Sequence, residues 1–551
     1  MCSSDLTLQA TIGARIDRLG ASAKRTLNAA AVIGARFDTE LLAALIQDVD
    51  VAPLIEAELV SQVRFAPNAE YAFRHPLIRT VAYESQLKSV RAQSHRRLAE
   101  AIEARGSTDE NAALIAEHLE AAGDLRAAFD RHMRAGTWST FRDTVAAQTS
   151  WRRARQVADR LPDDDPDRVS MCIAPRTLLS GSAWRVGGSG ADTGFDELRD
   201  LCTAAGDRRS LVIGMTGQVV AKVMNARRRE ASRLASEHIA LLESVGDPTL
   251  TVGLSFTALV AKHETGEMAE VVRLAQRIID SAGGEPTTGN LIFGSPLAFA
   301  IAFRGAARWC LGIPGWRDDF AQGVAMARAA DPISLAGVIF YTYVFAIPGG
   351  VLLPDATALR DTADALAIAE RSGDEFSLHV TRFARGITLV HRDGPPREAG
   401  FTLLAQVREA AVQGRFMLTI VPVVDIHVAQ QKSRSGDLDG AIELARTVVD
   451  DLLSSGGSIW NALATTALVE ALLQRAGDAD LQEAQAAIDR LAAVATDPGF
   501  VLHDITLLRL RALLARARGD EASYSDLRDR YRDIAKTLGF DGHIAWAEAM
   551  A

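Results

Sequence analysis

The sequence predicts an all-α protein: a small helical domain that carries one β-hairpin, followed by a long α-solenoid of helical hairpins. Three observations predict this class. Apolar residues recur at helical spacing over most of the chain. Two short β-rich runs, VRFA and YAFR, flank a Pro-Asn turn near residue 67. A Gly-Asp pair then recurs through the remaining sequence.

Length and composition are those of a multidomain soluble protein. The 551 residues exceed one ordinary core, and 48% hydrophobic with 24% charged residues is an average balance. A net charge of −10 argues against a protein that coats nucleic acid. The four cysteines are Cys2, Cys172, Cys202 and Cys310. They form no CxxC pair, so the sequence predicts neither a zinc site nor a disulfide framework, which fits a cytoplasmic location.

The first six residues, Met1 to Leu6, resemble the translation of a sequencing-adapter end read from a GTG start. We interpret residues 1–6 as a non-native leader; a natural disordered N-terminus is the alternative. The next segment, LQATIGARIDRL, places apolar residues four, four and three apart on one helical face: Leu8, Ile12, Ile16 and Leu19.

Residues 7–87 are expected to form a winged-helix-like domain. ASAKRTLNAAAVI is a second helix that Ser22 can cap, and Asp38 or Thr39 can cap a third, TELLAALI. VAPLIEAELVSQ reads as a fourth helix before the hairpin. Helices followed by a small hairpin are the layout of a winged helix, with the hairpin as the wing.

The stretch from Phe73 to Leu87, FRHPLIRTVAYESQL, leaves the hairpin and turns into a helix at His75-Pro76. Proline is tolerated in the first turn, because the amide that it removes would lack an intrahelical partner. His75 therefore stands at a helix entrance, where free N–H groups and the dipole favour a negative charge such as a phosphate. The alternative is a core histidine with one satisfied hydrogen bond.

Residues 88–551 are expected to form the solenoid. Successive Gly-Asp pairs are separated by 83, 40, 127, 63, 41 and 42 residues, so three intervals lie near 41 and two near its multiples, whereas 63 does not fit. Glycine can end one helix in a left-handed conformation and aspartate can cap the next. The repeated pairs therefore predict tetratricopeptide-like hairpins with long helices. They are Gly123-Asp124, Gly206-Asp207, Gly246-Asp247, Gly373-Asp374, Gly436-Asp437, Gly477-Asp478 and Gly519-Asp520.

One apolar stretch raises the question of a membrane span. No charge occurs between Asp331 and Asp355, which is long enough to cross a bilayer. Gly337, Pro348, Gly349 and Gly350 interrupt it and no basic flank follows, so a buried solenoid helix ending in a turn is favoured and no membrane partner is expected.

Motifs for catalysis and metal binding are missing from the sequence. Gly-Lys never occurs, so there is no GxxxxGK[ST], and the glycine-rich Gly187–Gly194 is expected to be a loop. There is no HExxH or G-x-S-x-G, and His118 and His132 are expected to be surface or core residues. We expect no catalytic residue, no metal site and no cofactor in this chain, which is therefore not an enzyme.

Residues 7 to about 105 resemble the region that follows the nucleotide-binding domain in bacterial STAND-type signalling ATPases, including adenylate/guanylate cyclase–ATPase fusions and ATPases with LuxR-type output domains. The matching text is LQATIGARIDRL, AKRTLNAAAVIGARFD, YAFRHPLIRTVAYESQL and RAQSHRRLAEAIE. In related ATPases a winged-helix histidine, often in Met-His-Asp, touches the phosphates of ADP. The resemblance gives His75 and its neighbour Arg74 this nucleotide-sensing role, although Arg74 and Pro76 depart from that motif.

The resemblance implies a regulatory and sensory fragment whose solenoid binds a protein or a small-molecule signal. Its partner would be a missing upstream nucleotide-binding domain, which would hold ATP or ADP and magnesium. A transcription regulator of the LuxR-type ATPase class and a free-standing interaction scaffold are the alternatives. DNA binding is disfavoured, because TELLAALI and VAPLIEAELVSQ are apolar or acidic where a recognition helix needs basic or amide side chains.

Overall fold

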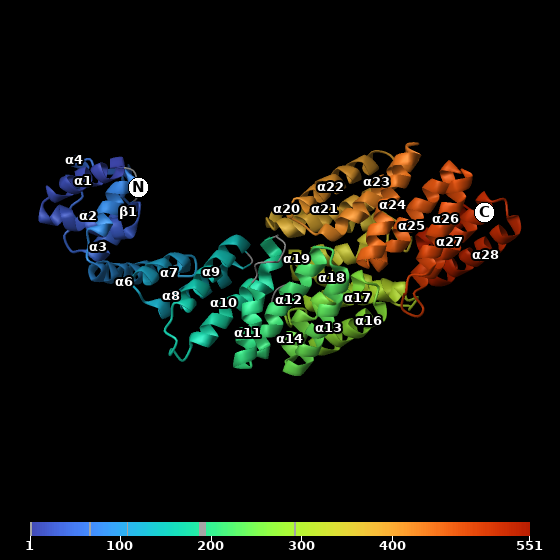
Figure 1. Cartoon of the computed structure of the whole chain (residues 1–551), viewed down its shortest axis with the longest axis horizontal. Helices are drawn as coiled ribbons and strands as arrows, with labels where there is room; N and C mark the ends of the chain where they lie inside the picture. The colour runs from blue at the N-terminus through green and yellow to red at the C-terminus, as the bar shows by residue number, and fades with distance from the viewer. Residues whose placement is uncertain are drawn as a thin grey trace. The chain divides into compact units, whose positions relative to one another are not determined.

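The computed structural model describes residues 3–65, 68–106, 108–140, 142–186, 194–290 and 294–550 (Figure 1). Within these ranges the protein is nearly all helix with one three-stranded sheet, which confirms a helical-repeat architecture. The chain forms two compact units, Met1–Leu179 and Ser180–Ala551. The boundary expected at residue 87 lies inside the first unit and stays a prediction. The expected loop at Gly187–Gly194 lies, except for Gly194, outside the described residues.

The first unit begins with short helices around a small antiparallel sheet in the order β1-β3-β2. Its core contains Ile16, Leu27, Leu42 and Leu54, each at most 2% exposed. The predicted hairpin is present as β2 and β3, and β1 adds a third strand on the other side of β3. The elements are α1 (Ser3–Asp17), α2 (Ala21–Ile33), β1 (Arg36–Asp38), α3 (Thr39–Leu45), α4 (Ala52–Glu56), β2 (Val60–Arg64), β3 (Glu70–Phe73) and α5 (Pro76–Glu84).

Two local predictions in this unit are wrong. Gly20, not Ser22, precedes α2, whereas the Asp38 carboxylate does cap α3 by accepting a 2.8 Å hydrogen bond from the Leu41 amide. The helix expected over residues 51–62 ends at Glu56. Val60 lies opposite Phe73 in the sheet and is fully buried there, so strand pairing overrides the helical periodicity of this segment.

Helical hairpins follow in the first unit. Each helix packs against the next, and the glycine-to-tryptophan contact of Gly136 with Trp151 brings α8 and α9 together. The helices are α6 (Lys88–Ala104), α7 (Ala112–Ala121), α8 (Leu125–Ser139), α9 (Thr144–Asp159) and α10 (Arg168–Ser182), the last of which runs across the boundary between the units.

The second unit continues the hairpins and carries the largest core of the protein. In Figure 1 its helices run from green to red, and sequential helices lie side by side. The elements are η1 (Ala183–Val186), α11 (Phe195–Ala205), α12 (Arg208–Met224), α13 (Arg228–Val245), α14 (Pro248–Leu254), α15 (Phe256–Glu264), α16 (Met268–Ala282), α17 (Pro296–Cys310), α18 (Trp316–Ala330), α19 (Pro332–Ile339), η2 (Phe340–Val344), α20 (Ala356–Ser372), α21 (Glu375–Val390), α22 (Pro395–Val412), η3 (Leu418–Ile420), α23 (Val421–Arg434), α24 (Leu438–Ser455), α25 (Ser458–Arg475), α26 (Asp478–Ala492), α27 (Val501–Ala517), α28 (Glu521–Leu538) and α29 (Asp541–Glu548).

Six of the seven Gly-Asp pairs form the predicted bend, with glycine at positive φ and the aspartate carboxylate accepting from the amide three residues later. The exception is Gly477-Asp478. There Ala476 takes the left-handed conformation at φ 57°, and the Asp480 carboxylate accepts from the Gly477 amide at 3.0 Å. The bend has therefore moved one residue towards the N-terminus.

The second unit closes on itself. Helices from its first half contact helices from its second half, α15 against α25 and α17 against α27. Arg228 on α13 is fully buried, and its guanidinium donates to Glu264, to Ser455 on α24 and to the Thr419 carbonyl. Inner helices of the two halves thus pack against each other.

Helix α29, near the end of the chain, packs against the turn that follows η2. The Asp541 amide donates to the Val351 carbonyl at 3.1 Å, and the His543 amide donates to the Gly350 carbonyl at 2.9 Å. A Cβ on Gly542 would lie 2.8 Å from the Gly350 Cα, so this approach needs glycine at residue 542.

The apolar stretch after Asp331 forms the short helix α19, the π-helical turn η2 and a run of turns through Gly350. Its large side chains, among them Ile339, Val344 and Ile347, are buried in the core of the second unit, as the solenoid interpretation expects. Within the described residues no helix is long and apolar enough to cross a membrane.

Prediction on the bends: Asp374→Ala should destabilise the second unit by about 1 kcal/mol, because the carboxylate caps α21 through a 2.8 Å bond from the Ser377 amide. The exposed Asp478 is the matched control, because Asp480 makes the bond to the Gly477 amide in its bend. The denaturation midpoint and hydrogen exchange in the first turn of α21 measure the effect. Equal losses for Asp374→Ala and Asp478→Ala would contradict the assignment.

Candidate functional site

His75 stands between the sheet and α5, where the sequence places it. The Phe73 amide donates to the Ala35 carbonyl and the Arg74 amide to the Leu59 carbonyl, both at 3.1 Å, so the backbone before His75 is fixed on two sides. His75 is exposed, which excludes the core-residue alternative.

The His75 ring caps its own helix. Nδ1 accepts a 3.2 Å hydrogen bond from the Leu77 amide. A neutral imidazole whose Nδ1 accepts carries its proton on Nε2, so Nε2–H remains as a donor.

The expectation of free N–H groups at this helix entrance is wrong. Pro76 has no N–H, the Leu77 amide donates to the His75 ring, and the Ile78 amide donates to the His75 carbonyl. A phosphate here would therefore meet the Nε2–H of His75 and the Arg74 guanidinium rather than a row of backbone amides.

Arg74 is exposed and lies 3.6 Å from the Glu58 carboxylate. Glu58 adopts φ 54°, a left-handed conformation that costs free energy for a residue other than glycine. Arg15 on α1 donates to the Ala57 carbonyl at 2.7 Å and holds the same turn. The sequence offers no signal for Glu58, because a left-handed non-glycine residue leaves no pattern. This constellation contains no nucleophile with an adjacent base, and anion binding by His75 and Arg74 stays a prediction.

A pair of buried histidines, which the sequence analysis did not find, links α6 to α7. His95 Nδ1 lies 3.0 Å from His118 Nδ1, and the Tyr83 hydroxyl lies 2.8 Å from His95 Nε2. Burial lowers the pKa of each ring to about 4, with the charge of Arg79 adding to the effect. Both rings are therefore neutral at pH 7, and the pair acts in packing.

Metal and thiol chemistry find little support in the part of the chain that the structure describes. It contains no group of three His, Cys, Asp or Glu side chains that could hold a metal ion. Cys172, Cys202 and Cys310 are free and buried, and burial raises their pKa values, which disfavours the reactive thiolate. His132 is buried and lies 3.6 Å from Glu120.

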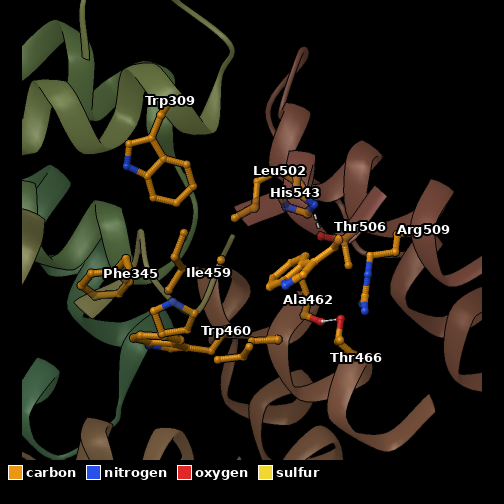
Figure 2. A pocket seen from close by; sticks show the side chains of 14 residues that line it. Trp309, Phe345, Ile459, Trp460, Ala462, Thr466, Leu502, Thr506, Arg509 and His543 are labelled. Carbon is orange, nitrogen blue, oxygen red and sulfur yellow. Dashed lines mark hydrogen bonds between the residues drawn. The ribbon is translucent and has the colours of Figure 1, made fainter. Parts of the chain in front are cut away.

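A second candidate site, here called the closure cavity, lies inside the second unit where α17, α25, α27, α29 and the turn after η2 meet (Figure 2). Its volume is about 40 Å³. The walls are mainly aromatic and apolar: Trp309, Phe345, Trp460, Leu502 and Trp546. Phe345 stacks on Trp460 with ring centroids 4.5 Å apart.

The polar lining of the closure cavity is sparse. Arg509 donates to Glu470 at 2.5 Å and lies 4.9 Å from the Trp546 ring centroid. The Tyr531 hydroxyl lies 2.9 Å from His543 Nδ1, and burial, together with the charge of Arg509, lowers the pKa of His543 to about 3. Among the described residues, the buried Trp309 Nε1–H and Arg509 Nε–H have no hydrogen-bond partner.

No family model matches the chain. It is 28% identical over 182 residues to an uncharacterized protein of Rhizobium meliloti, a match that covers 31% of this chain and 17% of that protein.

Two solved structures resemble the fold at low similarity. One is a signal transduction ATPase with numerous domains and a tetratricopeptide repeat sensor from Pyrococcus horikoshii, with TM-score 0.35, 10% identity, and coverage of 96% of this chain and 64% of that one. The other is a circular tandem repeat protein, with TM-score 0.17, 16% identity, and coverage of 86% and 93%. The chain thus spans less than two thirds of the first relative in either comparison, and these TM-scores carry no functional argument.

Prediction on His75: replacement by alanine should cost about 1 kcal/mol of first-unit stability, because the Leu77 amide loses its acceptor. His75→Asn is the matched variant, since an asparagine oxygen can accept the same amide. Denaturant unfolding and exchange of the Leu77 amide measure both. If the two variants lose equal stability, the ring does not act as a cap.

Prediction on pH: the first unit should lose stability as the pH falls from 6.5 towards 4. His95 and His118 have lowered pKa values in the folded state, so the unfolded chain binds more protons in this window. At pH 5 the loss due to His118 should be about 1–2 kcal/mol. Thermal unfolding at pH 5 and 7.5 measures it.

His118→Gln should flatten this pH dependence, whereas Tyr83→Phe, which keeps both histidines, should leave it in place. An unchanged pH dependence in His118→Gln would show that the stability loss arises elsewhere.

Proposed function

We propose that this chain is the regulatory and sensory part of a STAND-type signalling ATPase, in a protein linked to a nucleotide cyclase. The solenoid would receive a protein or small-molecule signal, and the chain would have no catalytic domain of its own. An upstream nucleotide-binding domain would be its partner and would hold ATP or ADP with magnesium. The sequence blocks of residues 7 to about 105 support this family assignment.

The arrangement of the first 87 residues supports a winged-helix-like domain. Helices α1 to α4 precede the β2–β3 hairpin, and β1, between α2 and α3, pairs with β3 to complete a three-stranded sheet. In this proposal the hairpin is the wing.

The single observation that carries the proposal is the placement of His75. It is exposed where β3 meets α5, its Nδ1 is occupied by the Leu77 amide, and its Nε2–H is left as a donor. A donor of this kind beside Arg74 suits the phosphate of a nucleotide held by a neighbouring domain. Loss of that contact would shift the balance between two packings of the domains.

A transcription regulator that reads DNA is the weaker alternative. Helix α3, TELLAAL, and helix α4, APLIE, contain no lysine or arginine and each carries a glutamate. A recognition helix needs several donors for base edges and phosphates. A gel shift that shows salt-sensitive duplex binding by the purified chain would favour this alternative. A free-standing scaffold is the third possibility, and a genomic stop codon just upstream of Thr7 would favour it.

Prediction on activity: the purified chain should hydrolyse no ATP and form no cyclic nucleotide, because no P-loop lysine is present to hold the phosphates. Phosphate release and cyclic-nucleotide assays with magnesium measure this. Turnover of ATP by the chain alone would refute the proposal.

The genomic reading frame upstream of Thr7 gives an independent test. A Walker motif there would support the proposal. Co-expression of that segment should then yield a complex in which His75→Ala, but not the exposed Asp478→Ala, weakens the retention of ADP. The His75 role is refuted if both variants retain ADP equally.

A further inference from the structure

The closure cavity is built by regularly spaced side chains. Leu502, Thr506 and Arg509 lie on one face of α27 (Figure 2). His543 and Trp546 lie one turn apart on α29. The π-helical turn η2 comes directly before Phe345 on the opposite wall, and such turns are frequent at functional sites. The cavity is therefore shared by both halves of the second unit.

Two of the unpartnered polar groups in the lining are N–H donors, and the third is Nε2 of His543. Trp309 is fully buried, and neither its Nε1–H nor Arg509 Nε–H has a partner among the described residues. A buried polar group without a partner destabilises the protein, so a ligand that supplies an acceptor to such a donor removes that cost.

The charged groups of the lining determine which ligand charge is favoured. Arg509 is cationic and is paired with Glu470 through its Nη2, which leaves its Nε–H as the free donor, and no aspartate or glutamate is among the described residues of the wall. His543 is neutral at pH 7, since its pKa is lowered to about 3. A cationic ligand would thus be repelled, and a carboxylate or carbonyl oxygen would be attracted.

We propose that the closure cavity binds a small planar compound with a carboxylate or carbonyl oxygen. Its ring would lie among Trp309, Trp460 and Trp546, and its oxygen would accept from Arg509. Aromatic rings in contact contribute binding free energy beyond that of the area that they bury. This inference specifies the small-molecule signal of the proposed function and rests on that proposal only for its biological role.

The size of the cavity couples binding to the end of the chain. About 40 Å³ holds roughly three water molecules, which is less than one aromatic ring needs. Trp546 is half-buried, so entry of a ring shifts this side chain and loosens α29 on the turn at Gly350. Ligand binding should therefore increase exchange of the Asp541 and His543 amides.

The test compares sodium benzoate with benzylamine, which have similar rings and opposite charge, on the full chain. We expect saturable benzoate binding by ligand-observed NMR and calorimetry, at least about tenfold tighter than benzylamine. Benzoate should also raise the unfolding temperature. No saturable binding of benzoate at millimolar concentration, or equal binding of both compounds, overturns the proposal.

Variants locate the binding site. Ala462→Leu fills the cavity and should weaken benzoate binding at least about tenfold, whereas Ala486→Leu, on the exposed face of α26, is the matched control and should not. If Ala462→Leu does not fold, Arg509→Met is tested instead. This variant should fold, because the Glu470 carboxylate that loses its partner is 37% exposed and can be hydrated. Arg509→Met should abolish the preference for benzoate. Unchanged binding in the folded variant overturns the proposal.

This outcome is separable from that of the proposed function. Ligand binding is measured on the chain alone and needs no ATPase domain. A failed benzoate test leaves the ATPase assignment standing, and an upstream sequence without a Walker motif leaves the ligand result standing.

Discussion

The buried guanidinium of Arg228 sets the architecture of the second unit. Its side chain is fully buried and it donates to Glu264 at 3.1 Å, to Ser455 at 2.9 Å and to the Thr419 carbonyl at 3.5 Å. Burial raises the pKa of Glu264, and Arg228 opposes that rise by stabilising the carboxylate. Removing one member of a buried ion pair commonly costs about 3–5 kcal/mol. Glu264 lies on α15, which packs directly against α13, so an open solenoid would keep this ion pair but would leave the guanidinium without Ser455 and the Thr419 carbonyl, which come from the second half of the unit.

Closure changes what a solenoid can recognise. In an open superhelix the inner helices line a broad groove, whereas here α15 and α17 pack against α25 and α27. The inner side chains, such as Phe303 and Ile505, belong to one continuous core. The closure cavity lies inside this core, among residues from both halves of the unit. A ligand in that cavity contacts both halves and can bias how firmly they close.

The parts of the fold that depend on local chemistry were predictable. A glycine that ends a helix and an aspartate that caps the next act within four residues, so the sequence suffices to locate six of the seven bends. At Gly477 it fails, because Ala476 takes the left-handed conformation in its place. Closure was not predictable, since Arg228 and Ser455 are far apart in the sequence and no pattern connects them. The sequence likewise predicts helix around Val60, whereas strand pairing with the distant Phe73 determines the conformation of this segment.

The candidate sites show the same division between local and distant determinants. The His75-Pro76 turn was located from the sequence, because proline and the change of periodicity are local signals. The hydrogen bond from the Leu77 amide to the His75 ring could not be predicted from the sequence, since it depends on the rotamer of one side chain. The closure cavity draws Trp309, Trp460 and Trp546 from three helices, and in the sequence these tryptophans look like ordinary packing residues. The unpartnered indole N–H of Trp309 and the Nε–H of Arg509 belong to residues of one cavity lining, and only the folded chain brings these two residues to that cavity.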